Sequence, residues 1–173
     1  MSLFPITLAE LNQLDRTGFV AICGPLFEHS PWIADRTFVQ APFASREVLH
    51  AALCATLGMA TNDEKLGLVR AHPDLVGRLA REGALTREST DEQAAAGLTA
   101  LTVDEVRQFD THNATYRAKF NFPFVICARE NKKDAILAAF PVRLQNSPEQ
   151  ELATALIEIG KIARLRLWDA VLE

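Results

Sequence analysis

The chain has 173 residues, of which 49% are hydrophobic and 23% are charged. This length and apolar content suit one folded domain with a buried core and argue against disorder. Its 18 basic and 22 acidic residues give a net charge of −4, which lacks the basic footprint of nucleic-acid-binding proteins, so we expect no nucleic-acid partner. No apolar run approaches the roughly 18–20 residues that span a bilayer, and the first residues lack a basic segment before a long apolar one. We therefore expect no membrane partner and a cytoplasmic protein.

The aliphatic composition favours helices over strands. The chain has 26 Ala and 22 Leu, which are good helix formers, against 10 Val and 8 Ile, which are β-branched. With the apolar spacing, these counts predict an all-α fold: a single-domain compact helical bundle of about eight to ten helices with one extended segment near 121–128. The predicted helices span 7–14, 16–24, 31–39, 46–58, 62–71, 74–81, 90–97, 103–120, 132–144 and 148–171.

Helix-start signals recur along the chain. A Ser or Thr followed three residues later by Glu or Gln satisfies two backbone N–H groups of a helix N-terminus reciprocally. No linker longer than a few residues separates the predicted helices, so we expect residues 1–173 to form one domain. Pro141 is expected to kink or shorten the helix that contains it. The capping pairs are Thr7/Glu10, Thr61/Glu64, Ser89/Glu92, Thr102/Glu105 and Ser147/Gln150.

The segment 120–128 does not follow the helical pattern. It is rich in aromatic and β-branched residues, and Pro123 disfavours a continuous helix through it. If the segment is extended, its backbone N–H and C=O groups must bond another segment, water or a ligand. Such a stretch can bind a flat polar heterocycle through hydrogen bonds from its main chain. The alternative interpretation is a core segment that opens the next helix.

The cysteines and three of the four histidines give no sign of a metal site. Cys23, Cys54 and Cys127 lie in apolar surroundings without a C-x-x-C pair, so we interpret them as buried thiols. The chain has no H-E-x-x-H motif, no phosphate-cradling glycine loop and no dinucleotide fingerprint. We therefore expect neither a metal nor a cofactor. The histidines interpreted as surface or packing residues are His29, His50 and His112.

His72 differs from the other histidines because it precedes Pro73. A residue before proline is pushed out of the α region, so His72 is expected at a corner between two helices, with its ring projecting from the junction. Corners of this kind present side chains to clefts. The alternative interpretation is a hinge or N-cap-like histidine with a structural role.

Glu92 has two interpretations as well. With Ser89 it forms a predicted capping box, which is a sufficient structural explanation. A helix N-terminus also attracts anionic and polar ligands, because its N–H groups are free and its dipole end is positive. Ser89, Glu92 and Gln93 are then candidates to face a ligand.

An arginine falls on the apolar face of the C-terminal helix. Arg166 continues an apolar stripe of that helix, whereas Arg164 lies well around the helix and can be solvated. An inward arginine needs an anionic or hydrogen-bonding partner, either an internal carboxylate or a carboxylated substrate. The stripe consists of Leu152, Leu156, Ile159 and Ala163.

Several short motifs occur together in one order along residues 30–168. They are Ala41-Pro42-Phe43, His72-Pro73-Asp74-Leu75, the element of Leu85, Thr86, Ser89, Glu92, Gln93, Gly97 and Leu98, the element of Asn113, Tyr116, Phe120 and Phe122-Pro123-Phe124, and Arg166-Leu167. In this combination the chain resembles the 2-oxo-4-hydroxy-4-carboxy-5-ureidoimidazoline (OHCU) decarboxylases of uric acid degradation. Asn121 stands where members of that family commonly have glycine, and Asn tolerates the left-handed conformation better than most residues.

The resemblance implies an all-helical, cofactor-free carboxy-lyase, usually a homodimer, that removes CO2 from OHCU and delivers (S)-allantoin. By the same resemblance the catalytic histidine is His72, and we take Glu92 as a second catalytic candidate on the mechanistic grounds given below. The positions implied to contact substrate are Pro73, Ser89, Thr90, Asp91, Glu92, Gln93, Phe124, Val125, Ile126, Cys127, Ala128 and Arg166.

The chemistry of such a reaction is compatible with these residues. Loss of CO2 leaves an electron pair that the neighbouring imine-like ring accepts, so the protein needs only to orient the carboxylate and deliver a proton to one face. We hypothesise that His72 acts as general acid, that Glu92 orients it, and that Arg166 meets a negative or carbonyl oxygen. Two other functions stay open, a non-catalytic helical binding module and a ureide hydrolase.

Overall fold

The structure is a computed structural model in which residues 5–77, 80 and 82–173 are described. The described part of the chain is predominantly helical, which confirms the all-α prediction. It divides into two compact units, one formed by Met1–Leu68 with Gly160–Glu173 and the other by Val69–Ile159. The expectation of one domain over residues 1–173 stays a prediction.

The first unit joins the two ends of the chain. A short parallel pair of strands, β1 (Ile6–Thr7) and β2 (Val171–Leu172), aligns Ile6 with Val171. Between the strands the chain forms α1 (Leu8–Leu11), α2 (Arg16–Cys23), η1 (Gly24–Leu26), α3 (Trp32–Thr37), η2 (Phe38–Gln40), α4 (Arg46–Gly58), most of α5 (Asn62–Ala71) and the last part of α10 (Pro148–Ala170).

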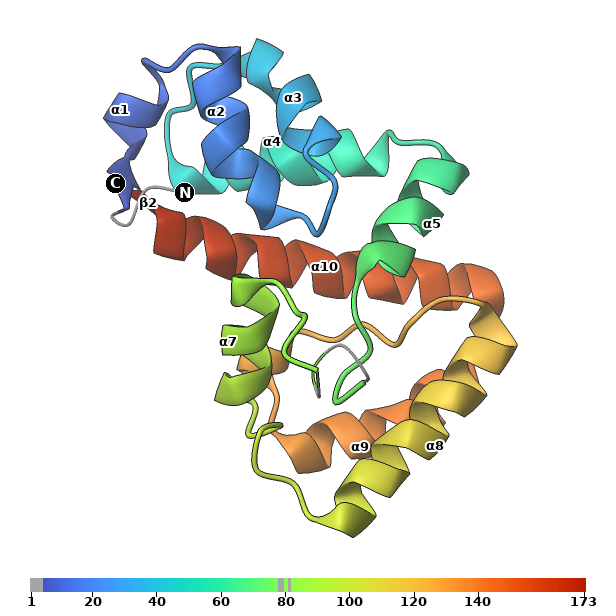
Figure 1. The fold of residues 1–173 in the computed structure, drawn as a ribbon. Coiled ribbons are helices and arrows are strands. Elements are labelled where there is room, and N and C mark those ends of the chain that lie inside the picture. Colours follow the sequence, from blue (N-terminus) through green and yellow to red (C-terminus); the bar gives the residue numbers. More distant parts are fainter. Residues whose placement is uncertain (1–4, 78–79, 81) are drawn as a thin grey trace. The chain divides into compact units, whose positions relative to one another are not determined.

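The core of the first unit lies between α2, α3 and α4, which are neighbours in Figure 1. Phe19 of α2 is fully buried and contacts the rings of Phe38 and Phe43, with centroid separations of 5.6 Å and 5.9 Å. Leu49 and Leu53, one turn apart on α4, are fully buried as well. Burial of these large apolar side chains stabilises the unit.

The second unit contains the end of α5, α7 (Arg87–Ala95), α8 (Val103–Phe120), η3 (Ala128–Glu130), α9 (Lys133–Arg143) and the first part of α10. Helices α8 and α9 pack against each other, as Figure 1 shows. Tyr116 of α8 is fully buried at the centre of an aromatic cluster. Its ring lies 5.2 Å from Phe124 in an edge-on contact, and Phe124 stacks on Phe140 of α9 at 3.9 Å.

Four of the five predicted capping boxes are present. Thr7/Glu10, Thr61/Glu64 and Thr102/Glu105 exchange reciprocal hydrogen bonds, and Ser147/Gln150 does the same before α10. The fifth prediction, Ser89/Glu92, is wrong. The N-cap of α7 is Thr86, whose hydroxyl accepts the backbone N–H of Ser89 at 3.2 Å, so the helix begins three residues earlier than predicted. Glu92 therefore lies inside the helix and does not cap it.

Two further predictions about helices need correction. Residues 74–77 form a turn rather than the start of a helix, because Val76 adopts a positive φ of 57°, which a right-handed helix excludes. Of the remainder of the predicted helix 74–81, residues 78–79 and 81 lie outside the described residues. Of the two effects expected of Pro141, an early end is wrong, because α9 continues to Arg143 with the proline in its last turn, and the kink stays a prediction.

Asn121 ends α8 in the left-handed conformation, with φ 58° and ψ 28°. This is the conformation that Asn was expected to tolerate in place of glycine, so that prediction is confirmed. The chain then runs extended from Pro123 to Cys127 before η3 begins. The predicted extended segment is therefore present inside a helical protein.

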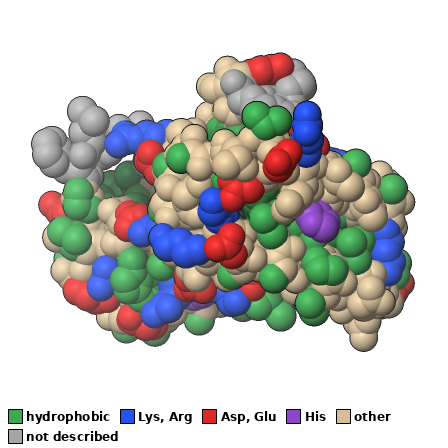
Figure 2. All heavy atoms as spheres, turned by 90° about the horizontal axis from the view of Figure 1, so that it is seen from below, with side chains coloured by type: hydrophobic (Ala, Val, Ile, Leu, Met, Phe, Trp, Pro, Cys, Tyr) green, Lys and Arg blue, Asp and Glu red, His purple; other side chains and the backbone are tan. Residues whose placement is uncertain are grey.

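The surface mixes charges of both signs. On the face shown in Figure 2, Lys and Arg side chains alternate with Asp and Glu and do not form a basic field of one sign, as the net charge of −4 leads one to expect. Among the described residues, we find no helix that combines the length and the apolar character of a membrane span.

Candidate active site

His72 is the first residue after α5 and is buried, with 7% of its surface exposed. Its backbone N–H donates to the carbonyl of Val69 at 3.2 Å, which closes the last turn of the helix before Pro73 turns the chain away. The predicted position at a corner is confirmed. His72 is therefore held in the protein interior at the end of a helix and is not a surface side chain.

The turn that follows His72 is held by side chains from two other helices. The Oε1 atom of Gln93, on α7, accepts the backbone N–H of Val76 at 3.0 Å. From α8, Asn113 donates its Nδ2 to the carbonyl of Leu75 at 2.9 Å. These bonds hold Val76 in a left-handed conformation that costs a β-branched residue roughly 1–3 kcal/mol. The structure next to His72 is therefore strained and held in place from outside.

An ion pair fixes the first residue of the same turn. Nε of Arg117 donates to both carboxylate oxygens of Asp74, at 2.9 Å and 3.0 Å. Gly77 approaches Asp74 so closely that a Cβ on this glycine would lie 2.7 Å from the Asp74 Cβ. The turn thus tolerates only glycine at its end.

Only some of the predicted site residues of helix α7 lie on its buried face. Ser89 and Gln93, one turn apart, are buried, and Glu92 beside them is half-buried. Thr90 and Asp91 lie on the outer side and are exposed. The structure thus separates the five predicted residues, with three on the face that meets the turn after His72 and two directed to solvent.

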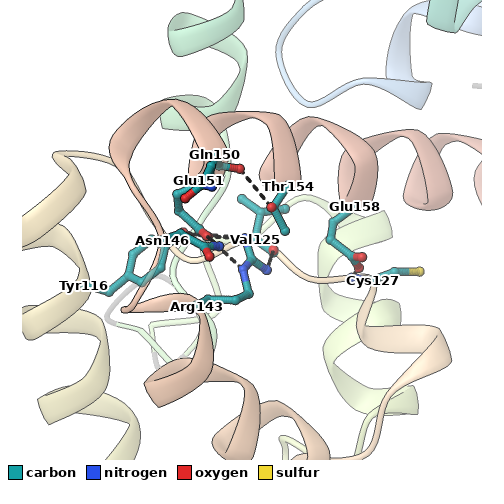
Figure 3. Close-up of polar contacts among 9 residues, drawn as sticks. All are labelled: Tyr116, Val125, Cys127, Arg143, Asn146, Gln150, Glu151, Thr154 and Glu158. Atoms are coloured by element: carbon teal, nitrogen blue, oxygen red, sulfur yellow. Dashed lines mark hydrogen bonds and ion pairs between the residues drawn. The ribbon is translucent and has the colours of Figure 1, made fainter.

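The extended segment has buried side chains and a main chain bonded by charged groups. Phe124, Val125, Cys127 and Ala128 are buried, and Ile126 is half-buried. The carbonyl of Val125 accepts from Arg143, and the N–H of Cys127 donates to Glu158 (Figure 3). Because most of these side chains fill the core, any ligand contact of the segment runs mainly through its backbone.

Electrostatics link Glu92 to this segment. Burial first, and then the carboxylates of Glu130, Glu158 and Glu92, raise the pKa of the Cys127 thiol to about 11. Helix α7 also packs against η3, and Lys132 donates to the carbonyl of Ala95 at the end of α7. The face of α7 that carries Glu92 and the segment 124–128 are therefore neighbours within the second unit.

Arg166 lies in the first unit and is buried, with 6% of its surface exposed. Its Nη1 atom lies 3.1 Å from Oε2 of Glu28, which is also buried, and 3.3 Å from the carbonyl of Pro25. The prediction that Arg166 points inward is confirmed, and of the two partners considered the structure provides the internal carboxylate. Arg164 is exposed and lies over the ring of Trp168, as its position on the helix predicted.

The remaining histidines and cysteines pack or face solvent. His50 bonds the carbonyl of Gly160 at 2.9 Å, His112 stacks on Phe140 at 5.0 Å, and His29 is exposed. Cys23 and Cys127 are buried and Cys54 is half-buried. The described residues contain no group of three or more His, Cys, Asp and Glu side chains that could hold a metal ion.

Two acidic residues on the buried face of α10 were not among the residues predicted from the sequence. That face contains Glu151 and Glu158, whereas the predicted stripe members Leu152 and Leu156 are only half-buried. The signal was Arg166 itself. Counting back from it in steps of four, four, three and four reaches Ile162, Glu158, Ala155 and Glu151, all of which are buried.

Comparisons with known proteins place this architecture in one enzyme class. The chain is 41% identical to the 2-oxo-4-hydroxy-4-carboxy-5-ureidoimidazoline decarboxylase of Halalkalicoccus jeotgali, over 95% of this chain and 91% of the relative. It is 40% identical to the mouse (Mus musculus) protein of the same name, over 94% and 91%. A solved structure of (S)-allantoin synthase superposes with a TM-score of 0.78 at 30% identity, covering 96% of this chain and 54% of that one. The chain thus spans about half of the synthase.

The fold and these relatives define the protein as a carboxy-lyase. The model of the OHCU decarboxylase family matches residues 12–168, and the chain belongs to this family. The matched range includes every residue of the predicted site, from His72 to Arg166.

Proposed function

We propose that this chain decarboxylates OHCU to (S)-allantoin, with His72 as general acid and base. The observation that carries the proposal is a buried histidine at a helix end, followed by a strained turn that Gln93 holds from the neighbouring helix. A general acid must be fixed within hydrogen-bonding reach of the atom it protonates, and this arrangement fixes the backbone beside His72.

The reaction needs orientation and one proton delivered to a defined face. The bond between the carboxylate and the hydroxyl-bearing ring carbon breaks and CO2 leaves. The electron pair forms a C=C bond to the neighbouring imine carbon, while the C=N electron pair moves to the nitrogen, which takes up a proton. The resulting enol loses its hydroxyl proton and becomes a carbonyl, the former imine carbon receives a proton on one face, and that face decides which enantiomer forms. Holding the carboxylate out of the ring plane and placing a histidine as proton donor on one side supply both requirements.

The other predicted residues have roles that their positions support. Glu92 orients His72 and the substrate hydroxyl from the inner face of α7. Ser89 and the Nε2 amide of Gln93 bind the ureido group, because Oε1 of Gln93 is already bonded to Val76. Pro73 borders the substrate ring, and backbone groups of 124–128 bind the ring amides. Thr90 and Asp91 act through their backbone position, since both side chains are exposed.

Arg166 meets a negative or carbonyl oxygen of the substrate while its pairing with Glu28 compensates its charge. Nη1 of Arg166 bonds Glu28 and the carbonyl of Pro25, so in this proposal the substrate oxygen meets a guanidinium that is already anchored. A homodimer and a cytoplasmic location complete the proposal. No cofactor is part of it.

The test compares wild type with His72→Asn on freshly generated OHCU, following circular dichroism as chiral allantoin accumulates. Wild type accelerates the decay and gives the (S) enantiomer, and His72→Asn reduces kcat by at least about 100-fold, as expected for loss of a general acid. His29→Asn is the matched control, because His29 is exposed at φ 47°, a conformation that Asn accepts.

Three results would contradict the proposal. Wild type that leaves the decay of OHCU at its spontaneous, racemic rate excludes the activity and favours a non-catalytic binding module. Release of ammonia instead of CO2 identifies a ureide hydrolase. Loss of activity on treatment with a chelator contradicts a reaction without a metal.

A further inference from the structure

The extended segment between α8 and η3 is bonded along one edge by two charged side chains. Nη1 of Arg143, from the end of α9, donates to the carbonyl of Val125 at 2.5 Å. Oε2 of Glu158, from α10, accepts the backbone N–H of Cys127 at 2.8 Å. Figure 3 shows both side chains directed at the segment from separate helices. A charged group in the place of a neighbouring strand makes each of these bonds stronger than a backbone pair.

Arg143 is itself held by a buried polar cluster. Its Nε and Nη2 atoms lie 2.7 Å and 2.5 Å from Oε1 of Glu151, which has no exposed surface. The hydroxyl of Tyr116 donates to the same Oε1, and Nδ2 of Asn146 donates to Oε2 at 2.6 Å. Two atoms of the guanidinium are thus fixed on Glu151, and the third nitrogen is aimed at Val125.

Such a buried polar cluster contributes little net free energy to the stability of a core. A buried ion pair is often no more stable than apolar residues of the same volume, because both charges must be desolvated. The pair is nevertheless able to fix geometry, since the planar fork of arginine leaves little freedom to the group it bonds. Apolar residues in place of Arg143 and Glu151 would fill the same volume, but they would not fix the position of the Val125 carbonyl.

The bonds leave one residue of the segment, Ile126, with its backbone N–H and C=O unused. In an extended chain, the N–H and C=O of successive residues point to opposite edges. Val125 and Cys127 use the edge that faces Arg143 and Glu158, and the carbonyl of Cys127 also accepts from Asn131 at 2.9 Å. The N–H and C=O of Ile126 point to the other edge, and no residue in the described part of the chain bonds them.

We propose that Arg143 and Glu158 are positioning residues of the decarboxylase. By bonding Val125 and Cys127 from behind, they present the N–H and C=O of Ile126 to the amide groups of the substrate. This inference rests on the proposed function and adds to it the two side chains that orient the backbone of 124–128. Neither side chain itself needs to touch the substrate.

Kinetics on OHCU with matched variants tests the inference. Arg143→Lys keeps the charge opposite Glu151 but lacks the second arm that reaches Val125. Glu158→Leu removes the acceptor of the Cys127 N–H, whereas Glu158→Gln keeps an acceptor oxygen. We expect Arg143→Lys and Glu158→Leu to raise KM about tenfold with a smaller change in kcat, because a contact made in ground and transition state alike is lost. Glu158→Gln should restore KM to within about threefold of wild type.

Tyr116→Phe is the control for a purely structural role. It removes a hydrogen bond from the same buried cluster, but the bond that is lost goes to Glu151 and not to the backbone of Val125. It should lower the thermal midpoint and leave KM and the enantiomeric excess of allantoin unchanged, whereas Arg143→Lys lowers the enantiomeric excess as well. The inference is overturned if active, folded Arg143→Lys and Glu158→Leu keep the wild-type KM, or if Tyr116→Phe raises KM as much as they do. Wild type without activity on OHCU overturns the proposed function instead.

Discussion

Gln93 of α7 accepts the backbone N–H of Val76 at 3.0 Å, four residues after His72. This bond joins the helix that carries Glu92 to the turn that follows the histidine. The side chain of Gln93 therefore stabilises the turn after His72, in addition to any contact that it makes with substrate.

Replacement of Gln93 by Leu should leave the Val76 N–H buried and unbonded. We expect the free energy of unfolding to fall by about 1–3 kcal/mol, measured by urea denaturation, together with a loss of kcat. Gln93→Glu keeps an acceptor oxygen at the same position and should retain most of the stability. Equal stability of the Leu and Glu variants would show that the Val76 bond contributes nothing.

Removing either partner of the Arg166–Glu28 pair should destabilise the first unit. Arg166→Met leaves the carboxylate of Glu28 buried without its cation, which costs roughly 3–5 kcal/mol. The double variant Arg166→Met with Glu28→Leu should recover most of this loss in urea denaturation. If Arg166 also binds substrate, the double variant stays inactive despite its recovered stability, and full activity in that variant would exclude such a role.

Asn121 offers a test of backbone strain alone, since its side chain is exposed and its φ is 58°. Asn121→Ala should lower the free energy of unfolding by about 1 kcal/mol, because a Cβ without a polar side chain disfavours the left-handed region. Asn121→Gly should be neutral or stabilising. Urea denaturation of the three proteins checks the order, and an alanine variant as stable as the glycine one would contradict it.

Protonation of Glu105 should lower the free energy of unfolding at acidic pH. Its bonds to Lys133 and to the backbone and hydroxyl of Thr102 lower its pKa to about 2, below the usual value of 4.5. A carboxyl whose pKa is lowered by folding stabilises the protein fully above its unfolded pKa, and this contribution is lost as the pH falls from about 4.5 to about 2. The difference in unfolding free energy between wild type and Glu105→Gln should therefore shrink between pH 6 and pH 2.5. A difference that is constant over this range would show that the charge is not responsible.

The sequence predicted local features well wherever adjacent residues decide them. Capping pairs such as Thr102/Glu105 act within one helical turn, and they occur as expected. The corner at His72 follows from Pro73, and the extended segment follows from Pro123 and its aromatic neighbours. The motifs around these positions also carried the resemblance to the family that the comparisons confirmed.

Features that depend on distant contacts were harder to predict. Thr86 and Ser89 are both residue types that cap helices, but only Ser89 has the Glu three residues later that marks a capping box, and the structure shows that α7 is capped by Thr86. The turn at 74–77 exists because Gln93 and Asn113 hold Val76 and Leu75 from other helices. Glu151 and Glu158 were missed because an apolar stripe was assigned to leucines, although the bonds to Arg143 and Cys127 bury the two glutamates.

The bond from Arg143 to the carbonyl of Val125 matters for engineering the substrate specificity of the enzyme. Every residue except proline carries the same backbone N–H and C=O, so no substitution at Ile126 other than proline removes the groups that the segment offers. Selectivity at this edge can be altered only from the side that faces away from the ligand. Variant libraries aimed at new heterocycles should therefore randomise the residues around Arg143 and Glu158 as well as the residues proposed to contact the substrate.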